Sequence, residues 1–263
     1  MRYKCLDLFC CAGGAAMGLH RAGFDVTGVD INPQPRYPFE FIQGDALAQD
    51  LSQYDFVWAS PPCQAHSSLT SLTSKRNNAD LIPATRAKTK QWGGIYIIEN
   101  VAARVLENPV RLCGTHFGLH VARHRYFESN VPLVGLGGCD HRGKELYTVL
   151  TKSCRKIGDM RGPSSHEKGK AAMGIDWMTQ HELGEAIPPA YSEYLGRQVI
   201  QHIESAREAR CEELVAMLRD GDMAWEVAGC NSVQGGIRDA RFEAILDYRA
   251  RLLAKIDERR DTQ

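Results

Sequence analysis

Short apolar runs that alternate with turns and a helical stretch constrain the fold of this chain more than any other feature. The apolar runs lie at residues 3–9, 23–30, 39–45, 54–60 and 94–101. Between the first two runs, small residues form a turn and a helical pattern follows. Apolar strands that alternate with helices are typical of a parallel sheet covered by helices on both faces. The sequence therefore predicts an α/β fold with a mostly parallel sheet.

Beyond residue 60 the pattern is less regular. The polar stretch 64–90 has little periodicity and predicts a long mobile loop. Thr179 and Glu182 have the spacing of a capping box at a helix start. We expect a partly helical segment at 105–117 and strands at 123–129 and 146–150. Helices are expected at 179–186 and 191–209, followed by a mostly helical tail at 211–260.

Cysteine usage and hydropathy indicate a reducing compartment. The nine cysteines are odd in number and irregularly spaced, and no signal peptide precedes the first strand. No run approaches the roughly 18 apolar residues of a membrane-spanning helix. We therefore expect free thiols, a cytoplasmic protein and no membrane partner.

Charge is balanced overall but segregated along the chain. The formal net charge is +0, which argues against a wholly basic binder. Lys and Arg outnumber Asp and Glu in residues 75–90 and 142–170, whereas acids outnumber bases from residue 204 onward. Local basic stretches of this kind are compatible with a nucleic-acid partner.

The turn after the first apolar run is a candidate ligand site. The run Asp7–Gly14 ends in Gly13 and Gly14, and small residues let the backbone approach a ligand at a helix N-terminus. Asp30 closes the second strand, where dinucleotide-type folds bind ribose hydroxyls with an acid. Asp45 stands where it could meet an adenine amine. The layout suits an adenosyl ligand, although a tight turn followed by solvated acids would give the same pattern.

A cysteine follows two prolines at the end of the fourth apolar run. Pro61 and Pro62 fix the backbone and remove N–H donors, so the chain leaves the sheet as a stiff loop that presents Cys63. Glu99 and Asn100 end the fifth run, and ligands bind outside the carboxyl ends of parallel strands. Cys63 and Glu99 are therefore expected to face one cleft.

A thiol beside a carboxylic acid is an unusual pair for hydrolysis, because no clear histidine base stands next to it. The pair suits attack on an electron-poor ring with simultaneous protonation. Taken singly, Cys63 could equally be a small buried apolar residue, and Glu99 a helix cap or a solvated strand end.

Two arginines follow at alternate positions. Arg123 and Arg125 would lie on one face of a strand. There they could orient a carboxylate, a carbonyl or a phosphate. A surface strand edge is the alternative interpretation.

In combination these motifs follow the order found in the DNA cytosine methyltransferase family, whose members methylate carbon 5 of the base. The chain resembles this family over roughly residues 3–200. Met173–Thr179 and Ile187–Tyr191 are similar to the compact phage-encoded members. The ordered motifs are Asp7-Leu-Phe-x-x-x-Gly-Gly14, Gly44-Asp45, Pro61-Pro-Cys-Gln64, Glu99-Asn-Val101 and Arg123-x-Arg125.

The resemblance implies a Rossmann-like S-adenosylmethionine-dependent methyltransferase fold with a small recognition insert and a helical C-terminal extension. Residues 1–129 and 173–203 would form the catalytic domain, 130–172 the target-recognition region and 204–263 the extension. We expect a monomer that acts on double-stranded DNA in the cytoplasm of a bacterial or phage-infected cell. Self-protection, restriction-modification and regulation stay open as its purpose.

The resemblance also implies a mechanism. The Cys63 thiolate would add to carbon 6 of a flipped cytosine. Glu99 would protonate the ring nitrogen next to the amino group, and Asn100 would orient Glu99 or the loop that bears Cys63. Arg125, with Arg123, would contact the base carbonyl and the thiol region. Carbon 5 would then take the methyl group of S-adenosylmethionine.

Two further sets of residues come from the same resemblance. The methyl donor would be lined by Asp7, Phe9, Gly13, Gly14, Asp30, Asp45 and Pro62. The DNA would be contacted by Gln64, Ser67, Ser68, Lys75 and Arg76.

The chain departs from the family pattern at several positions. Cys11 replaces the first glycine of the turn, which is tolerable only if the backbone there does not require glycine. Asp30 is shorter than the usual glutamate, and Val121 replaces a glutamine before the arginine pair. Arg197 stands where the family has an asparagine, which puts a contact on the donor side in doubt.

Cysteine and histidine pairs raise the question of a metal. Cys113 and His116, and Cys139 and His141, have ligand-like spacings. Nothing in the sequence requires the two pairs to meet, and Cys113 occupies a position expected in a core helix. We therefore predict no metal.

Two alternative functions stay open. A tRNA cytosine methyltransferase would share the chemistry, although the Cys-Phe-Thr type motif usual in that branch is absent. A non-catalytic DNA-binding or adaptor protein would depend on the helical tail instead. The presence of Cys63, Glu99 and Arg125 argues against this second alternative.

Overall fold

The computed structural model describes residues 2–62, 80–159 and 163–230. The chain comprises two compact units, Met1–His202 and Ile203–Gln263. The fold below is that of the first unit. Within the described ranges, no helix combines the length and the apolar character that crossing a membrane requires.

A seven-stranded sheet forms the centre of the first unit. The strands are β1 (Lys4–Leu8), β2 (Asp25–Asp30), β3 (Glu40–Gln43), β4 (Phe56–Ala59), β5 (Ile95–Asn100), β6 (Val110–Leu112) and β7 (Arg125–Ser129). Their order is β3-β2-β1-β4-β5-β7-β6, and the first five run parallel to one another. β7 is antiparallel to both β5 and β6. This topology confirms the predicted mostly parallel sheet.

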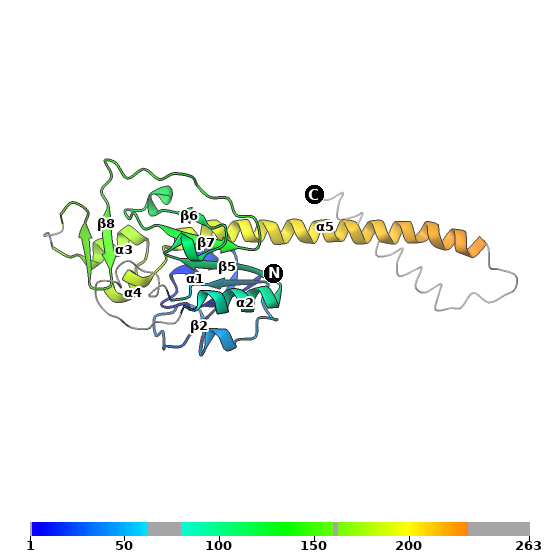
Figure 1. The fold of residues 1–263 in the computed structure, drawn as a ribbon, viewed down its shortest axis with the longest axis horizontal. Helices are drawn as coiled ribbons and strands as arrows, with labels where there is room; N and C mark the ends of the chain where they lie inside the picture. Colours follow the sequence, from blue (N-terminus) through cyan, green and yellow to red (C-terminus); the bar gives the residue numbers. More distant parts are fainter. Residues whose placement is uncertain (1, 63–79, 160–162, 231–263) are drawn as a thin grey trace. The chain divides into compact units, whose positions relative to one another are not determined.

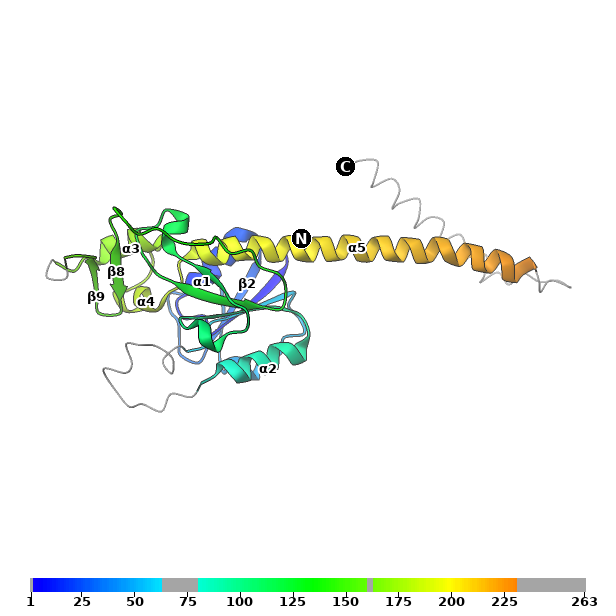
Figure 2. The same cartoon turned by 45° about the horizontal axis from the view of Figure 1, so that its top comes forward.

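Helices and a small hairpin complete the unit, which includes the last helix only as far as His202. The helices are α1 (Gly14–Ala22), α2 (Ile82–Trp92), α3 (His166–Met173), α4 (Gln180–Glu185) and α5 (Pro189–Cys230), and the 3₁₀ turns are η1 (Ala46–Ala48), η4 (Ala103–Val105) and η5 (Gly114–Phe117). The hairpin pairs β8 (Tyr147–Leu150) with β9 (Ser153–Lys156). α3, α4 and this hairpin gather at one end of the sheet, away from α2 (Figure 1, Figure 2).

The sheet forms because its central strands are apolar on both faces. All four residues of β4 are buried, and Trp58, Phe24 and Phe56 are fully enclosed. Parallel strands that are covered on both sides have such continuous apolar runs. Burial of these side chains stabilises the fold by roughly 1.5–3 kcal/mol for each large apolar side chain.

One prediction about secondary structure was wrong, and another was right only in part. Within the expected loop at 64–90, residues 82–90 are helical as part of α2. The helix has a weak apolar stripe, but Pro83 near its start and Gly93 at its C-cap (φ 79°) mark its ends. The segment 105–117 is helical only in 3₁₀ turns at its ends, with β6 between them. The capping box at Thr179 and Glu182 is confirmed.

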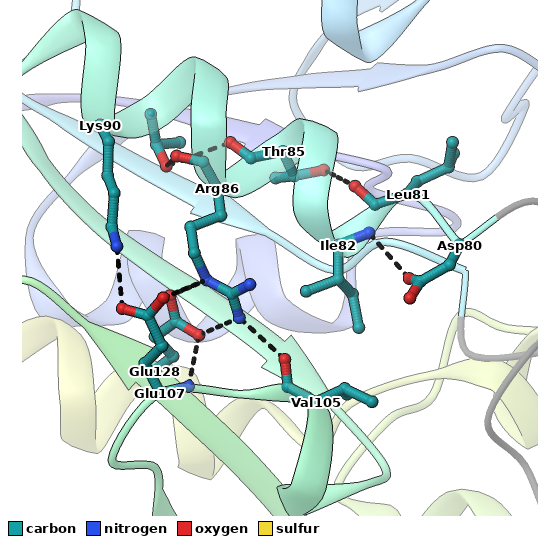
Figure 3. A network of polar contacts seen from close by, with 10 residues as sticks. Asp80, Leu81, Ile82, Thr85, Arg86, Lys90, Val105, Glu107 and Glu128 are labelled. Carbon is teal, nitrogen blue, oxygen red and sulfur yellow. Dashed lines mark hydrogen bonds and ion pairs between the residues drawn. The ribbon is translucent and has the colours of Figure 1, made fainter.

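A buried ion pair anchors α2 to the sheet. The Arg86 guanidinium donates to both carboxylate oxygens of Glu128 in β7 at 2.7 and 2.6 Å, and to the carbonyl of Val105 at 2.8 Å (Figure 3). Glu128 also accepts the Glu107 backbone N–H at 2.7 Å. The Glu128 side chain is 2% exposed, so its charge depends on these partners. Lys90 adds only an exposed pair with Glu107 (Figure 3).

We predict that Arg86→Met lowers the free energy of unfolding by about 3–5 kcal/mol, because it leaves the Glu128 carboxylate buried without its cation. Lys90→Met is the matched control on the same helix and should cause a much smaller loss, because its partner is in water. Urea unfolding followed by circular dichroism measures both. Equal losses for the two variants would contradict the anchoring role of Arg86.

Candidate active site

A cavity of about 470 Å³ lies at the carboxyl ends of the parallel strands. Phe9 follows β1, Asp30 ends β2, Pro61 follows β4 and Glu99 lies near the end of β5, and all four line the cavity. Ligands bind at this edge in open α/β sheets. The structure thus brings together side chains that are far apart in the sequence.

The turn between β1 and α1 forms one wall. Phe9 and Cys11 have positive φ values of 59° and 45°, and Gly13 has a φ of 83°. Left-handed backbone costs a residue other than glycine roughly 1–2 kcal/mol. Glycine would adopt this left-handed conformation without strain, whereas Cys11 adopts it at a cost. The replacement of glycine by Cys11 therefore strains the turn.

The two glycines serve close packing. A Cβ on Gly13 would lie 2.8 Å from Pro38 Cδ, and one on Gly14 would lie 2.4 Å from the carbonyl oxygen of Ile187. Gly14 lines the cavity, whereas Gly13 faces Pro38 and Tyr37. The turn can therefore fold tightly onto its neighbours only with glycine at these positions.

Asp7 is the most deeply buried acid of the site. It is 0% exposed, and both carboxyl oxygens lack a hydrogen-bond partner among the described residues. Burial raises the pKa of Asp7 well above its usual range, the charge of Asp30 raises it further, and the backbone N–H of Ala16 opposes the shift in part. A carboxyl group in this state is suited to a cationic ligand, which would favour its ionised form.

Asp30 is fixed by the backbone of both neighbouring turns. Its carboxylate accepts the Cys11 N–H at 3.1 Å and the Asn32 N–H at 2.9 Å. Ile31 follows it, lines the cavity and is 69% exposed. The Ile31 side chain can pack against the face of a ring, and the Asp30 carboxylate can accept hydrogen bonds from hydroxyl groups. Asp45, which follows the neighbouring strand β3 and also lines the cavity, accepts the Leu47 N–H at 2.8 Å.

Glu99 and Arg125 form the central ion pair of the site. Arg125 Nε lies 3.0 Å from Glu99 Oε1, and both side chains are largely buried. Burial raises the pKa of Glu99, while the charges of Arg125 and Arg123 oppose the shift. An acid with a raised pKa is suited to proton transfer near neutral pH.

Asn100 joins β5 to the loop after β4. Its side chain is fully buried, and Nδ2 donates to the carbonyl of Pro61 at 3.4 Å. Pro61 and Pro62 line the cavity, and Cys63 is the next residue of the chain. The predicted residues Cys63, Gln64, Ser67, Ser68, Lys75 and Arg76 lie outside the described residues.

Arg123 and Arg125 occupy different surroundings. Arg125 reaches the cavity, but the Arg123 guanidinium donates to the carbonyls of Val149 and Gly184. Arg123 thereby ties the β8–β9 hairpin to α4, and its charge lowers the pKa of Glu99. The expected shared strand face does not form, because β7 begins only at Arg125.

The other departures from the family pattern have structural partners. Arg197 pairs with Glu193 one turn earlier in α5 at 2.8 Å. Val121 is 2% exposed and forms an isolated bridge with Tyr147. Both side chains are thus engaged in packing or pairing within the fold.

Several lining residues were not predicted from the sequence. They are Ile31, Asn32, Leu81, Thr151, Met178, Gly184, Glu185, Ala186 and Ile187. Most of them come from the hairpin and from the end of α4, which reach the cavity through tertiary packing. The apolar residue after Asp30 was the one signal that could have been used.

Two solved structures share this architecture. A putative DNA modification methyltransferase encoded within an E. coli prophage aligns with a TM-score of 0.50 at 13% identity, and the S. pombe Dnmt2 methyltransferase aligns with a TM-score of 0.52 at 12% identity. Each alignment covers 77% of this chain and 99% of the other. The protein therefore has the Rossmann-like fold of the S-adenosylmethionine-dependent methyltransferases.

The sequence of the parallel strands resembles a known family. Residues 3–105, which contain β1 to β5, match the model of the C-5 cytosine-specific DNA methylases. The predicted resemblance is confirmed over this segment. No curated protein gives a significant match to the chain.

We predict that Asp7→Asn stabilises the unliganded protein at neutral pH. The folded-state pKa of Asp7 lies above its unfolded value of about 3.9, so the native state holds a proton that the unfolded chain releases. Stability therefore falls as pH rises through the window between these two values. The variant should lack this fall, and its advantage over the parent should grow with pH.

Urea unfolding at several pH values measures the difference. Asp25→Asn, at an exposed position at the start of β2, is the control and should behave like the parent protein. A destabilised Asp7→Asn variant at neutral pH would contradict a raised pKa of Asp7 in the folded protein.

Proposed function

We propose that this protein transfers a methyl group from S-adenosylmethionine to carbon 5 of cytosine in DNA, through a covalent adduct of Cys63 with a flipped base. The observation that carries the proposal is the cavity. Acids suited to a cationic donor, the Glu99–Arg125 pair and the chain that leads into Cys63 meet there. The family match over residues 3–105 supports cytosine as the base.

One side of the cavity fits the methyl donor. The fixed Asp30 carboxylate suits ribose hydroxyls, and the exposed Ile31 suits an apolar ring face. Asp45 stands where it could accept from an adenine amine. Asp7, with two carboxyl oxygens that lack partners, would face the positive charge of the donor. The bound donor supplies an electrophilic methyl group.

The other side fits a pyrimidine. Glu99, whose pKa is raised by burial, would donate a proton to the ring nitrogen beside the amino group. Arg125 holds the carboxyl group by its ion pair and would contact the base carbonyl. Phe9, Gly14 and Pro62 border the same cavity, so base and donor would lie close together.

The chemical steps balance around Cys63. Its thiolate would add to carbon 6 and form a C–S bond, while Glu99 protonates the ring nitrogen. This addition would convert the 5,6 double bond into a 4,5 enamine. Carbon 5 of the enamine would then attack the methyl carbon, and the donor would leave as S-adenosylhomocysteine. Loss of the carbon-5 proton to a base and expulsion of the thiolate would restore the ring, and the ring nitrogen would return its proton to Glu99. Asn100 would position Cys63 through the carbonyl of Pro61.

Residues 130–172 would recognise the target DNA. Thr151, in the turn of the β8–β9 hairpin, lines the cavity, so this region borders the place of the flipped base. Lys152 and Lys156 of the hairpin are exposed and suit phosphate contacts. Further DNA contacts are proposed for Gln64, Ser67, Ser68, Lys75 and Arg76.

We further propose that the protein acts as a monomer in the cytoplasm of a bacterial or phage-infected cell. A role in self-protection or restriction-modification fits this activity.

The experiment is incubation of the full chain with duplex DNA and a donor labelled in its methyl group, followed by bisulfite mapping of the modified cytosines. Label should appear in DNA at defined sites. Cys63→Ser should still bind the donor in calorimetry but lose methyl transfer by at least about a thousandfold. Cys5→Ala, a buried thiol in β1, is the matched control and should keep the activity.

Three results would overturn the proposal. Label in tRNA but not in DNA would replace the substrate. Turnover retained by Cys63→Ser would exclude the covalent route. Donor binding without transfer to any nucleic acid would favour a non-catalytic DNA-binding role.

A further inference from the structure

We propose that Cys113, His124, Cys139 and His141 form a structural zinc site, here called the Cys/His cluster. Cys113 follows β6, and His124 immediately precedes β7. Cys139 and His141 belong to the stretch 131–146 between β7 and β8, which contains no helix or strand. The four residues thus come from three segments that the fold brings together, outside the residues that line the cavity.

The geometry is close to that of a tetrahedral site. One ligand atom from each residue lies within 4.8 Å of the other three. Cys113 Sγ is 3.2 Å from His141 Nε2, and His124 Nε2 is 3.1 Å from Cys139 Sγ. With Zn–S near 2.3 Å and Zn–N near 2.0–2.1 Å, tetrahedral ligand atoms lie about 3.3–3.8 Å apart. Small side-chain shifts would therefore be enough to enclose an ion.

The donor set selects the kind of metal. Two thiols and two imidazoles are the ligands of structural zinc, whereas Mg²⁺ and Ca²⁺ prefer oxygen. Zinc binding would release one proton from each thiol to solvent, and the two thiolates would neutralise the ion. Four protein ligands leave no open position, so the site would be structural and not catalytic.

A metal at this site would help to order the stretch 131–146. The stretch 131–146 has large apolar side chains in water, with Val134 66% and Leu136 39% exposed. Elsewhere it is tied by the backbone of Val134, which bonds to Gln198 and Tyr194 of α5. Ordering a long segment costs conformational entropy, and a metal that links its middle to β6 and β7 would offset part of that cost.

His124 also connects the cluster to the active site. It is the residue before Arg125, and the Arg125 guanidinium donates to the His124 carbonyl at 2.9 Å. Metal ligation at His124 would therefore hold the start of β7, where Arg125 pairs with Glu99. This consequence for catalysis depends on the proposed function, but metal binding itself does not.

His116, not His124, is the ligand that the spacing after Cys113 suggests. In the structure, His116 Nδ1 accepts the Cys113 backbone N–H at 3.3 Å, and His116 is not one of the four clustered residues. The pair predicted from the sequence is thus replaced by a residue eleven positions beyond Cys113. His116 therefore provides a discriminating control.

The test is metal analysis of the full chain, purified without chelators, by plasma mass spectrometry. We expect one zinc per chain. Cys139→Ser and His124→Ala should each lose most of the metal, while His116→Ala and Cys154→Ala should keep it. Circular dichroism shows which variants are folded, so loss of zinc can be distinguished from failure to fold.

A second measurement does not depend on variants. Cobalt added to metal-free protein should give the visible bands of a tetrahedral ion and a thiolate-to-cobalt charge-transfer band. Absence of both zinc and these bands would overturn the proposal. So would a Cys113–Cys139 disulfide in the purified protein, or zinc that depends on His116 and not on His124.

Discussion

The parallel register of β1, β4 and β5 is the constraint on which the site depends. Leu8 lies opposite Ala59, and Ala59 lies opposite Ile98. The next residue of each strand therefore emerges at the same level, which places Phe9, the Ser60–Pro62 loop and Glu99 around one cavity. A shift of one residue would turn each of these side chains to the other face of the sheet. Close packing of the enclosed side chains Phe56 and Trp58 of β4 opposes such a shift.

Buried acidic groups at this edge of the sheet reduce the stability of the unliganded fold. Burial raises the pKa of Asp7 and of Glu99, and neither effect stabilises the unliganded fold near neutral pH. Both shifts are useful if a cationic donor meets Asp7 and a ring nitrogen meets Glu99. The buried Arg86–Glu128 pair joins α2 to β7, the strand next to β5. It thereby holds the start of α2 beside the cavity. Stability is thus concentrated next to the site and reduced within it.

The sequence predicts the parts of the fold that local patterns determine. The five parallel strands have short, continuous apolar runs, which are typical of strands buried on both faces. The motifs at their ends are short and follow a fixed order. Glu99 and Asp30 were therefore placed at the carboxyl ends of their strands from strand alternation, and both line the cavity. The resemblance to the family added Pro62. Thr179 and Glu182 identified the start of α4 because a capping box is a local interaction.

Tertiary contacts decide what could not be predicted. α2 lacks a strong apolar stripe, and its attachment depends on Arg86 meeting Glu128 from a distant strand. Arg123 was expected beside Arg125, but the carbonyls of Val149 and Gly184 hold it elsewhere. The meeting of Cys113 with Cys139 and His141, and the inclusion of His124, follow from the packing of three segments. Spacing alone cannot indicate such a site.

The measurement that tests the account most directly is covalent trapping with duplex DNA that carries 5-fluorocytosine at the mapped target position. Fluorine cannot leave carbon 5 as a proton does, so elimination stops and the thioether to carbon 6 persists. The account predicts a complex that requires S-adenosylmethionine and contains the DNA on the peptide of Cys63. An adduct on another cysteine, or a protein that methylates DNA but forms no adduct, would contradict it.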